Sequence, residues 1–482
     1  MWANFCFVCQ LVVLGFSLTL MLFNSLPFLF AFLPVTYVVF WMLKRRTQRY
    51  VWLTVTGYVF YASWNYKFCA LMACSTLVAY VAGLGLLRWD DRWRRRMCLV
   101  VPVSTDLALL GFFKYSNFVV ETTNHVTSWL GISQTLPSIN VILPVGISFY
   151  TFHTITYIVD AYRRIIVPTR NVFEFSCYVS LFSQLVAGPI VRFRQIEADL
   201  DHIDQADRAR HLDIGWSFFA IGLAKKVLIA DTIAAVIDPA LLRYAELSTV
   251  SAWLCMLGYT YQLYFDFSGY SDMAVGLGYL FGIRLPQNFN SPYKAVDIAD
   301  FWRRWHISLS SFLRDYLYIP LGGGRGTPSA VYQNLMITML LGGLWHGASW
   351  TFVVWGGYHG LLLILNRHFS ELWGRVPSAA RQVVTFVLVV VGWVFFRSPT
   401  FTMAATLLRE MFVWHSGTGM VGEPMLLAML VLAASITHFS PNTFEMRHEW
   451  RPLAATGLLV LFALSLFAIA GNRSTPFLYF QF

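Results

Sequence analysis

The chain has 482 residues, of which 57% are hydrophobic, 17% aromatic and only 12% charged. Soluble domains carry roughly 25% charged residues, so this composition excludes an ordinary soluble enzyme and predicts a polytopic membrane protein. The net charge of +10 would suit nucleic-acid binding, but the Lys and Arg residues cluster between apolar segments. This is the positive-inside pattern of membrane proteins, and no nucleic-acid partner is expected.

The cysteines do not indicate a metal site. Their number is odd, no CxxC pair or His-Cys spacing occurs, and most lie in apolar runs, at positions 6, 9, 69, 74, 98, 177 and 255. We interpret them as reduced packing residues.

Residues 1–20 form an apolar stretch without a basic n-region or a clear cleavage site, so a cleavable signal peptide is not expected. They are either an extra helix or an upstream extension, because Met21 is a second plausible start. Residues 21–482 contain no linker long enough to separate soluble domains, and one membrane domain is expected.

The apolar segments predict about eleven to thirteen membrane-spanning helices. Residues 26–43 form the first, and the basic residues that follow at 44–49 are expected in the cytoplasm. Further spans are expected at 51–66 and 68–87 as a hairpin, at 98–113, 142–162 and 216–237, and near 380–396, 402–414, 423–438 and 453–470. Lys225 and Lys226 interrupt one of them and are expected to extend to the membrane surface.

Three stretches place polar or helix-breaking residues inside apolar runs. Residues 143–160 carry His153 and Asp160 and predict a cavity-facing helix, since hydroxyl groups bonding to their own helix do not explain these two. Gly188 and Pro189 predict a broken helix, followed by a re-entrant turn that bears Arg192 and Arg194. The third stretch is residues 259–278.

Asp266 and Asp272 lie in the apolar run 259–278. Two carboxylates there could orient a histidine, bind a cation or pair with arginines. Pairing is the commonest fate of a buried charge, so catalysis by either acid is the less favoured interpretation.

Residues 300–318 have the clearest amphipathic pattern and predict one helix that lies in the interface or lines a wet cavity. Its apolar side would hold Trp302, Trp305, Leu309, Phe312 and Tyr316, and its polar side Arg303, His306, Ser310 and Arg314. The glycine-rich loop LGGGRG at 321–326 could hold a phosphate, but it lacks the GKS/T of a P-loop.

The strongest candidate for chemistry is His346, in the otherwise apolar run LGGLWHGASW at 341–350. An ionisable residue at membrane depth is costly and usually faces a polar cavity where it has a function. Gly343 and Gly347 leave room for another backbone or a ligand. The alternative, a helix-packing motif whose histidine makes a structural hydrogen bond, has about equal weight on composition alone.

The chain ends in the aromatic sequence FLYFQF after Pro476. A tail this apolar would avoid water, so it should pack into the membrane domain or a partner. Tyr479 is then either an interfacial aromatic anchor, which physical chemistry alone favours, or a nucleophile that carries an acyl group.

Several of these runs together resemble the membrane-bound O-acyltransferase (MBOAT) family. They are LPVGISFYTF at 143–152, AGPIVRFR at 187–194, YFDFSGYSDMAVGLG at 264–278, FWRRWHISLSSFLRDYLYIPLGG at 301–323, LLGGLWHGASW at 340–350 and the FLYFQF ending. Within the family they are most similar to the bacterial polysaccharide O-acetyltransferases, above all the alginate branch. The resemblance runs from about Met21 to the last residue.

The resemblance implies a ring of helices with re-entrant segments around a central tunnel that links the two membrane faces. His346 matches the histidine shared by the family, and His306 matches the second histidine of this branch. The family implies acetyl-coenzyme A as the cytoplasmic donor, with no permanently bound cofactor, and an exported polymer as the eventual acceptor. The tail resembles that of the small partner protein in D-alanine transfer to teichoic acid, which makes Tyr479 a candidate acyl carrier.

We therefore expect an O-acetyltransferase of the bacterial inner membrane. His346 would act as general base, His306 would orient the acyl group or share the proton, and Asp266 or Asp272 would fix a tautomer. The coenzyme A phosphates would meet Arg303, Arg304, Arg314 and Arg325, with Arg192 and Arg194 as second choices. A periplasmic SGNH-type transferase would pass the acetyl group onward.

Two other classes compete with this expectation. A transporter or flippase for a polymer precursor also needs polar groups at mid-membrane, but it predicts inverted repeats, whereas the polar motifs gather between residues 143 and 350. A non-catalytic scaffold would not need His346 together with a buried tail tyrosine. Which polymer is acetylated, and the oligomeric state, do not follow from the sequence.

Overall fold

The computed structural model describes residues 21–132, 135–139, 141–186, 188–417, 423–471 and 475–478. Within these ranges the chain forms helices and no strand, which confirms the all-α class. Residues 1–20 and Tyr479 lie outside the described residues.

The α-helices of the first half are α2 (Leu33–Met42), α3 (Arg46–Asn65), α4 (Cys69–Arg88), α5 (Arg92–Leu110), α6 (Ser116–Trp129), α7 (Ile147–Tyr162), α8 (Val172–Ser180), α9 (Phe182–Leu185), α10 (Phe193–Asp201), α11 (Arg208–Ala224) and α12 (Asp231–Leu242).

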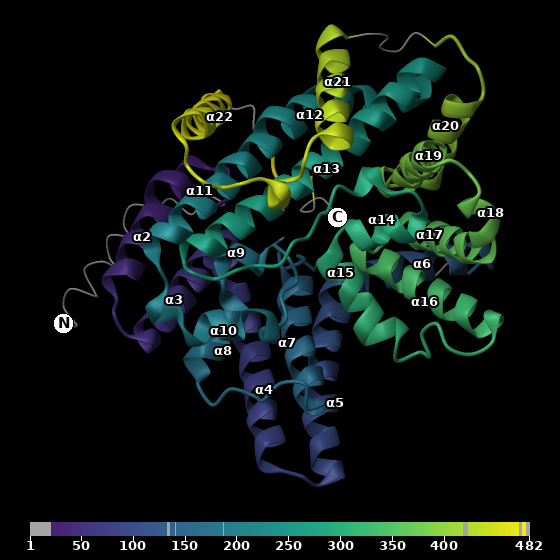
Figure 1. Ribbon diagram of the computed structural model, residues 1–482. Helices are drawn as coiled ribbons and strands as arrows, with labels where there is room; N and C mark the ends of the chain where they lie inside the picture. Colours follow the sequence, from purple (N-terminus) through teal and green to yellow (C-terminus); the bar gives the residue numbers. More distant parts are fainter. Residues whose placement is uncertain are drawn as a thin grey trace.

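The second half begins with the longest of these helices, α13 (Thr249–Leu280). It continues with α14 (Ile298–Arg304), α15 (Ile307–Phe312), α16 (Pro328–His346), α17 (Trp350–His368), α18 (Ser370–Gly374), α19 (Ser378–Arg397), α20 (Phe401–Phe412), α21 (Pro424–Phe439) and α22 (Pro452–Ala470). Four π-helical turns interrupt the α-helices: η1 (Phe28–Phe32), η3 (Gly111–Tyr115), η5 (Lys225–Ala230) and η8 (Leu313–Tyr318). In Figure 1, α4 and α5 project from the lower side, α14 to α19 gather on the right, and α21 and α22 lie at the top.

Among the described residues, four helical stretches are long and apolar enough to cross a membrane: Arg46–Arg88, Arg92–Trp129, Ser378–Arg397 and Pro452–Ala470. Phe28–Met42 and Pro424–Phe439 are apolar but shorter. The remaining predicted spans fall on helices that are short or that carry polar side chains, as α13 does with Asp266 and Asp272. The membrane class is confirmed, whereas length and composition alone account for fewer spans than the eleven to thirteen that we expected.

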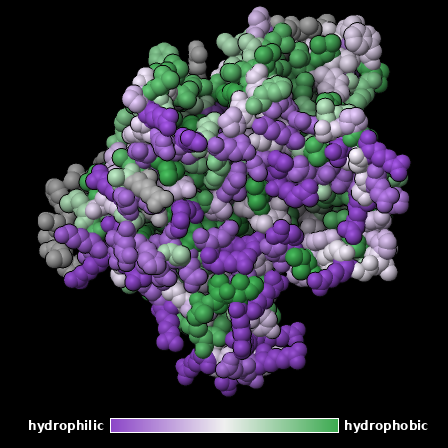
Figure 2. Space-filling view, viewed as in Figure 1, coloured by the Kyte–Doolittle hydropathy of each residue, from purple (hydrophilic) through white to green (hydrophobic). Residues whose placement is uncertain are grey.

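The surface agrees with a protein in a membrane. Figure 2 shows hydrophilic residues across the middle of one face and at the lower tip, over the turn between α4 and α5, whereas the upper region over α21 and α22 is mainly hydrophobic. Exposed apolar side chains on α22 include Leu453, Leu459 and Phe467. Apolar groups on this scale are stable at a protein surface where lipid covers them.

Helices α11 and α13 pack backbone against backbone. A Cβ atom on Gly222 would lie 2.5 Å from the carbonyl oxygen of Gly269, and one on Gly276 would lie 2.6 Å from that of Gly215. The two glycine pairs therefore set the closest approach of these helices, as small residues do in membrane proteins. This contact also fixes how Asp266 and Asp272 on α13 face the lysines that follow α11.

The predicted break at Gly188 and Pro189 is confirmed, since α9 ends at Leu185 and α10 begins at Phe193. The side chain of His153 on α7 explains how part of the broken backbone is tolerated, because its Nε2 accepts a hydrogen bond from the Val191 N–H at 3.3 Å. Tyr178 donates to the Val191 carbonyl oxygen at 2.9 Å. His153 thus supports irregular backbone.

The prediction of a single helix over residues 300–318 is wrong. The backbone breaks at Trp305 and His306, which separates α14 from α15, and π-helical turns follow from Leu313. His306 adopts φ 44° and ψ 55°, in the left-handed region. As a result His306 does not lie on a polar helix face but is completely buried, beside Trp305, which is also buried.

The glycine contact between α11 and α13 is testable by adding a single methyl group. Gly222→Ala should destabilise the protein by about 1–3 kcal/mol, because overpacking a tight contact forces the backbones apart. Thermal unfolding in detergent would measure the loss. Gly457→Ala on α22 is the matched control, since a Cβ there meets no atom within 4 Å; equal melting temperatures for the two variants would refute the role of the contact.

Candidate active site

His346 is the last residue of α16, and its side chain is buried with 4% exposure. The predicted close approach occurs at Gly343, where a Cβ would collide with the carbonyl oxygen of Phe352 on α17. Aromatic rings surround the imidazole, with centroids 5.0 Å away for Trp345 and Trp355 and 5.3 Å away for Phe396. The histidine therefore lies in an aromatic pocket between α16, α17 and α19.

Two side chains of the π-helical turn η3 cap the end of α16. Lys114 Nζ donates to the carbonyl oxygens of Trp345 and, at 3.3 Å, of His346, and the Tyr115 hydroxyl donates to that of Leu344 at 2.9 Å. The last carbonyls of a helix have no partner within it, so these contacts satisfy groups that lipid cannot. They also fix the backbone that carries His346, which the sequence analysis did not anticipate.

His306 lies next to His346, with 6.4 Å between the ring centroids. It contacts Phe267 of α13 edge to face at 4.7 Å. A left-handed backbone costs on the order of 1 kcal/mol or more for a residue other than glycine, and such strain often accompanies functional sites. The structure therefore brings together the two histidines that the sequence singled out, 40 residues apart in the chain.

Asn288 decides which nitrogen of His306 carries the proton. The Asn288 Oδ1 atom accepts from the Ser308 N–H at 3.2 Å and from the Ser308 hydroxyl at 2.8 Å, so this atom is the amide oxygen. His306 Nδ1 lies 3.1 Å from the same oxygen and must donate to it. The neutral ring then keeps the lone pair on Nε2, for which the described residues provide no hydrogen-bond partner.

A small cavity of about 10 Å³ adjoins His346. Its walls are formed by Leu263, Asp266, Phe267, Trp305, His346, Trp355, Trp393, Phe396, Phe477 and Leu478. This volume suits about one water molecule. The cavity as it stands is too small for an acyl group, which can enter it only when neighbouring side chains move.

The described part of the C-terminal tail, residues 475–478, packs into the membrane domain, one of the two positions that we predicted. Phe477 and Leu478 are buried and form part of the wall of the His346 cavity. The Leu478 N–H donates to Asp266 Oδ2 at 3.1 Å. Tyr479, the candidate nucleophile, follows directly in the chain and lies outside the described residues.

The two aspartates of α13 pair with lysines, whereas we had expected arginines. Asp266 lies 2.5 Å from Lys226 Nζ, and Asp272 lies 2.6 Å from Lys225 Nζ and accepts from the Thr443 hydroxyl at 2.6 Å. The expectation that both lysines extend to the membrane surface is wrong, because their side chains are only 13% and 2% exposed. Of the two acids, Asp266 borders the His346 cavity, and Asn288 rather than either acid contacts His306 Nδ1.

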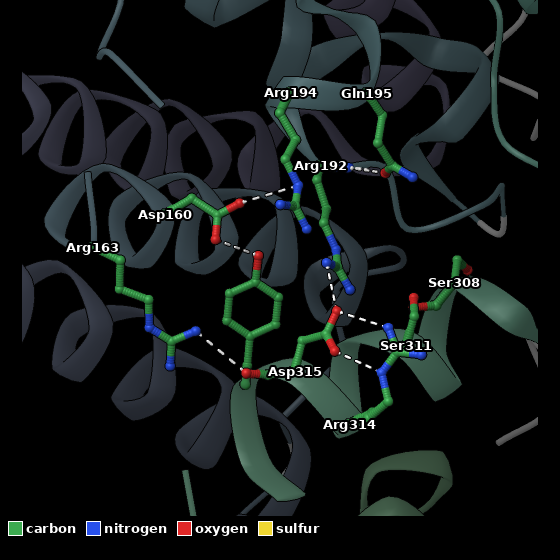
Figure 3. Close-up of polar contacts among 10 residues, drawn as sticks. Asp160, Arg163, Arg192, Arg194, Gln195, Ser308, Ser311, Arg314 and Asp315 are labelled. Carbon is green, nitrogen blue, oxygen red and sulfur yellow. Dashed lines mark hydrogen bonds and ion pairs between the residues drawn. The ribbon is translucent and has the colours of Figure 1, made fainter. Parts of the chain in front are cut away.

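A cluster of four arginines surrounds the start of η8 (Figure 3), and we call it the arginine cluster: Arg163, Arg192, Arg194 and Arg314. Asp315 accepts from Arg192 at 2.8 Å and from Arg314 at 2.6 Å, and its carbonyl oxygen accepts from Arg163 at 3.3 Å. Asp160 lies 3.7 Å from Arg194 and accepts from the Tyr316 hydroxyl at 2.7 Å. With two carboxylates for four guanidinium groups, the cluster has an excess of positive charge.

Burial by itself would raise the pKa of Asp315, but hydrogen bonds from Arg314 and Arg192 outweigh it and hold the pKa below its ordinary value. The carboxylate therefore stays ionised at neutral pH and fixes the guanidinium groups in place. The other candidate arginines lie elsewhere. Arg303 and Arg304 contact Asp300 on their own helix, at 3.6 and 3.0 Å, and Arg325 lies exposed in the glycine-rich loop.

A larger cavity of about 640 Å³ lies away from the histidine pair, between α11, α21 and α22. Apolar residues such as Ile221, Met429 and Leu458 form much of its wall. Lys225, His448 and Glu449 also border this larger cavity, but the buried histidine that the sequence singled out, His346, borders the smaller one, so size alone does not locate the candidate site.

Lys114, Tyr115 and Asn288 orient the histidines but were not predicted from the sequence. Lys114 stood out as a charge between apolar residues, and Asn288 as a polar residue in the connection between α13 and α14. Neither position shows a period or spacing that points to a histidine in a distant segment. Lys114 contacts Trp345, which lies 231 residues further along the chain, and Asn288 contacts His306, which lies 18 residues further along.

A neutral imidazole whose Nε2 lone pair has no partner among the described residues, a second buried histidine and a surrounding aromatic pocket define a site for proton transfer in an integral membrane protein. Such a site suits the transfer of an acyl group to a hydroxyl. The model of the MBOAT, membrane-bound O-acyltransferase family matches residues 163–405, which include both histidines. The chain belongs to this family and is an acyltransferase.

Three relatives represent the range of similarity. A protein named probable alginate O-acetylase AlgI from Pseudomonas aeruginosa is 38% identical over 96% of this chain and all of its own length. The peptidoglycan O-acetyltransferase of Helicobacter pylori is 34% identical over 96% of this chain and 98% of its own. The teichoic acid D-alanyltransferase of Bacillus subtilis is 29% identical over 55% of this chain and 71% of its own.

Asn288→Ala should lower the rate of acyl transfer by about 100-fold, because His306 loses the acceptor that orients its ring and selects its tautomer. Asn288→Asp retains an acceptor oxygen and should recover part of the rate. The comparison is made by following product formation at saturating donor. Asn124→Ala, at a half-buried asparagine whose side chain hydrogen-bonds to the backbone of Leu136, serves as the control, and full activity of Asn288→Ala would contradict the assignment.

Proposed function

We propose that this protein transfers acetyl groups from cytoplasmic acetyl-coenzyme A across the inner membrane for the O-acetylation of an exported polysaccharide, of which alginate is the best supported. The observation that carries the proposal is the position of the histidine pair beside the buried C-terminal tail. Phe477 and Leu478 share the cavity of His346, so the segment that contains Tyr479 begins next to the reacting groups.

The names of the relatives support the acceptor. Three of those named for alginate O-acetylation align along their whole length at 38% to 40% identity, and the relative named for peptidoglycan O-acetylation is nearly as similar. All of these names describe acetyl transfer to a carbohydrate polymer. Peptidoglycan, cellulose or another exopolysaccharide is the alternative acceptor.

The arginine cluster supports a donor that carries phosphate groups. A guanidinium group can bind a phosphate through two parallel N–H···O hydrogen bonds, and the excess positive charge of the cluster favours binding of an anion. The Arg314 side chain is 62% exposed and accessible to a ligand. The Arg192 side chain is only 7% exposed, and it forms a buried ion pair with Asp315. The cluster and His306 are joined by one short segment, α15 and the start of η8, so a donor whose phosphates bind the arginines can extend its thioester towards the histidines.

In the proposed reaction a hydroxyl oxygen attacks the carbonyl carbon of the thioester. His346 accepts the hydroxyl proton, and His306, with the lone pair on Nε2, is the second proton acceptor of the pair. The bond between the acyl carbon and sulfur breaks, and the proton passes from the imidazole to the departing thiolate. The products are an acetyl ester and coenzyme A, and the histidines return to their neutral forms.

The attacking hydroxyl is that of Tyr479, which gives an acetyl-tyrosine at the end of the tail. A polymer is too large to enter a closed pocket in the membrane, so an SGNH-type transferase in the periplasm takes the acetyl group from the tail to the polysaccharide. Asp266 supports the carrier by holding the Leu478 N–H immediately before it.

Mass spectrometry of the purified protein after incubation with acetyl-coenzyme A tests this scheme. The C-terminal peptide should gain the mass of one acetyl group, and both His346→Ala and Tyr479→Phe should abolish the gain. Release of coenzyme A that depends on His346 but leaves the peptide unmodified would replace the tyrosine carrier by direct transfer. Normal acetylation by a folded His346→Ala variant would remove the central claim.

The donor site is tested separately. Arg314→Gln should raise the KM for acetyl-coenzyme A about ten-fold with little change in kcat, because a lost phosphate contact weakens binding without touching the reacting atoms. Arg451→Gln is the matched control, at an exposed arginine that contacts Glu449. Equal KM values for the two variants would show that the phosphates bind elsewhere.

A further inference from the structure

Lys226 forms a buried ionic triad with two aspartates from different helices. It lies in the π-helical turn η5 between α11 and α12, and its Nζ is 2.6 Å from Asp231 Oδ1 and 2.5 Å from Asp266 Oδ1. All three side chains are at most 2% exposed. Two carboxylates and one ammonium group leave a negative charge in excess, and burying such an excess is costly unless further donors satisfy it.

The C-terminal tail supplies these donors. Thr475 donates to Asp231 through its hydroxyl at 2.6 Å and its N–H at 3.3 Å, and the Leu478 N–H donates to Asp266 at 3.1 Å. Lys226 Nζ in turn donates to the Thr475 hydroxyl at 3.3 Å and to the Pro476 carbonyl oxygen at 3.5 Å. The triad thus binds both ends of the segment 475–478, mostly through its main chain.

The side chains of this segment lead to the histidines. The Phe477 ring stacks on Tyr270 at 4.8 Å and contacts Phe267 at 5.5 Å. Phe267 itself contacts His306. The main-chain contacts and the ring contacts together fix the register of residues 475–478. A shift by one residue would replace the Leu478 N–H at Asp266 by a different group, and it would move the Phe477 ring away from Phe267.

We propose that Lys226, Asp231 and Asp266 form a receptor site for the C-terminal tail, and that they act as positioning residues that hold the chain at Leu478 so that Tyr479 enters the histidine site in one register. The expected effect of this docking on acyl transfer to the tail rests on the proposed function. The docking itself can be measured without any activity. The receptor recognises the segment by two main-chain N–H groups and the Thr475 hydroxyl, and it requires the ammonium group and both carboxylates together.

The docking is tested with carboxypeptidase on the purified full-length protein, by following the release of C-terminal residues. Thr475→Val removes the hydroxyl that joins Asp231 and Lys226 but changes no helix. It should speed the release about ten-fold, since a hydrogen bond to a buried charge is lost and cleavage follows the undocked population. Lys226→Met should speed it further. Thr456→Val is the matched control, at an exposed threonine of α22 that donates only to the Pro452 carbonyl oxygen.

A kinetic measurement separates positioning from a general loss of structure. Thr475→Val should lower kcat for acetyl transfer about ten-fold while the KM for acetyl-coenzyme A stays unchanged, because the arginine cluster is untouched. Release from Thr475→Val at the rate of Thr456→Val would overturn the proposal. If Lys226→Met does not fold, this comparison of the two threonine variants decides the question alone.

Tyr479→Phe distinguishes this inference from the proposed function. It should abolish acetylation of the tail and leave the tail protected from carboxypeptidase. If Tyr479→Phe retains acetyl transfer while Thr475→Val still speeds release of the tail, the receptor proposal is supported and the role of Tyr479 as acyl carrier is refuted. If Tyr479→Phe loses acetyl transfer while the tail of Thr475→Val stays protected from carboxypeptidase, the role of Tyr479 as acyl carrier is supported and the receptor proposal is refuted.

Discussion

Polar groups enclosed by helices in a membrane must find their partners within the protein, because lipid offers none. This constraint explains why residues far apart in the chain meet at the centre of the molecule. Lys114 satisfies the carbonyl groups at the end of α16, His153 accepts from the broken backbone at Val191, and Lys226 joins Asp231 and Asp266. Each contact links segments that are separate in the chain, so the polar network holds together a set of segments that apolar packing alone would leave free to slide.

The candidate chemistry lies where regular helix ends. His346 closes α16, His306 occupies a left-handed position between α14 and α15, and the tail reaches the same cavity without helical structure as far as Phe477. A residue inside a helix has its side-chain direction set by neighbouring turns, whereas a residue at a break can be aimed by one specific partner. Asn288 does this for His306, and the capped end of α16 does it for His346. Tight glycine contacts such as Gly343 against α17 give these irregular positions a rigid support.

Much of this arrangement could be predicted, and the failures share a cause. His346 stood out because a histidine in an apolar run is costly, and the packing of the tail followed from its apolar composition. The break at Gly188 and Pro189 followed from backbone chemistry. The amphipathic pattern of residues 300–318 was misleading, because its period describes a continuous helix and gives no sign of the left-handed turn at His306. Lys225 and Lys226 were expected at the membrane surface because their partners on α13, Asp272 and Asp266, lie more than 30 residues away in the chain.

The sequence by itself determined that the protein is an all-helical membrane protein of the O-acyltransferase family, with two histidines and a tail tyrosine as the candidate reactive groups. Composition, motif order and local backbone preference carry that information, since each depends only on residues near one another in the chain. Only the tertiary structure decided that His306 and His346 lie side by side, that Asn288 selects the tautomer of His306, and that a lysine between two aspartates holds the tail. Those contacts depend on how separate helices pack, and a single sequence contains no periodicity that pairs one buried polar residue with its partner on another helix.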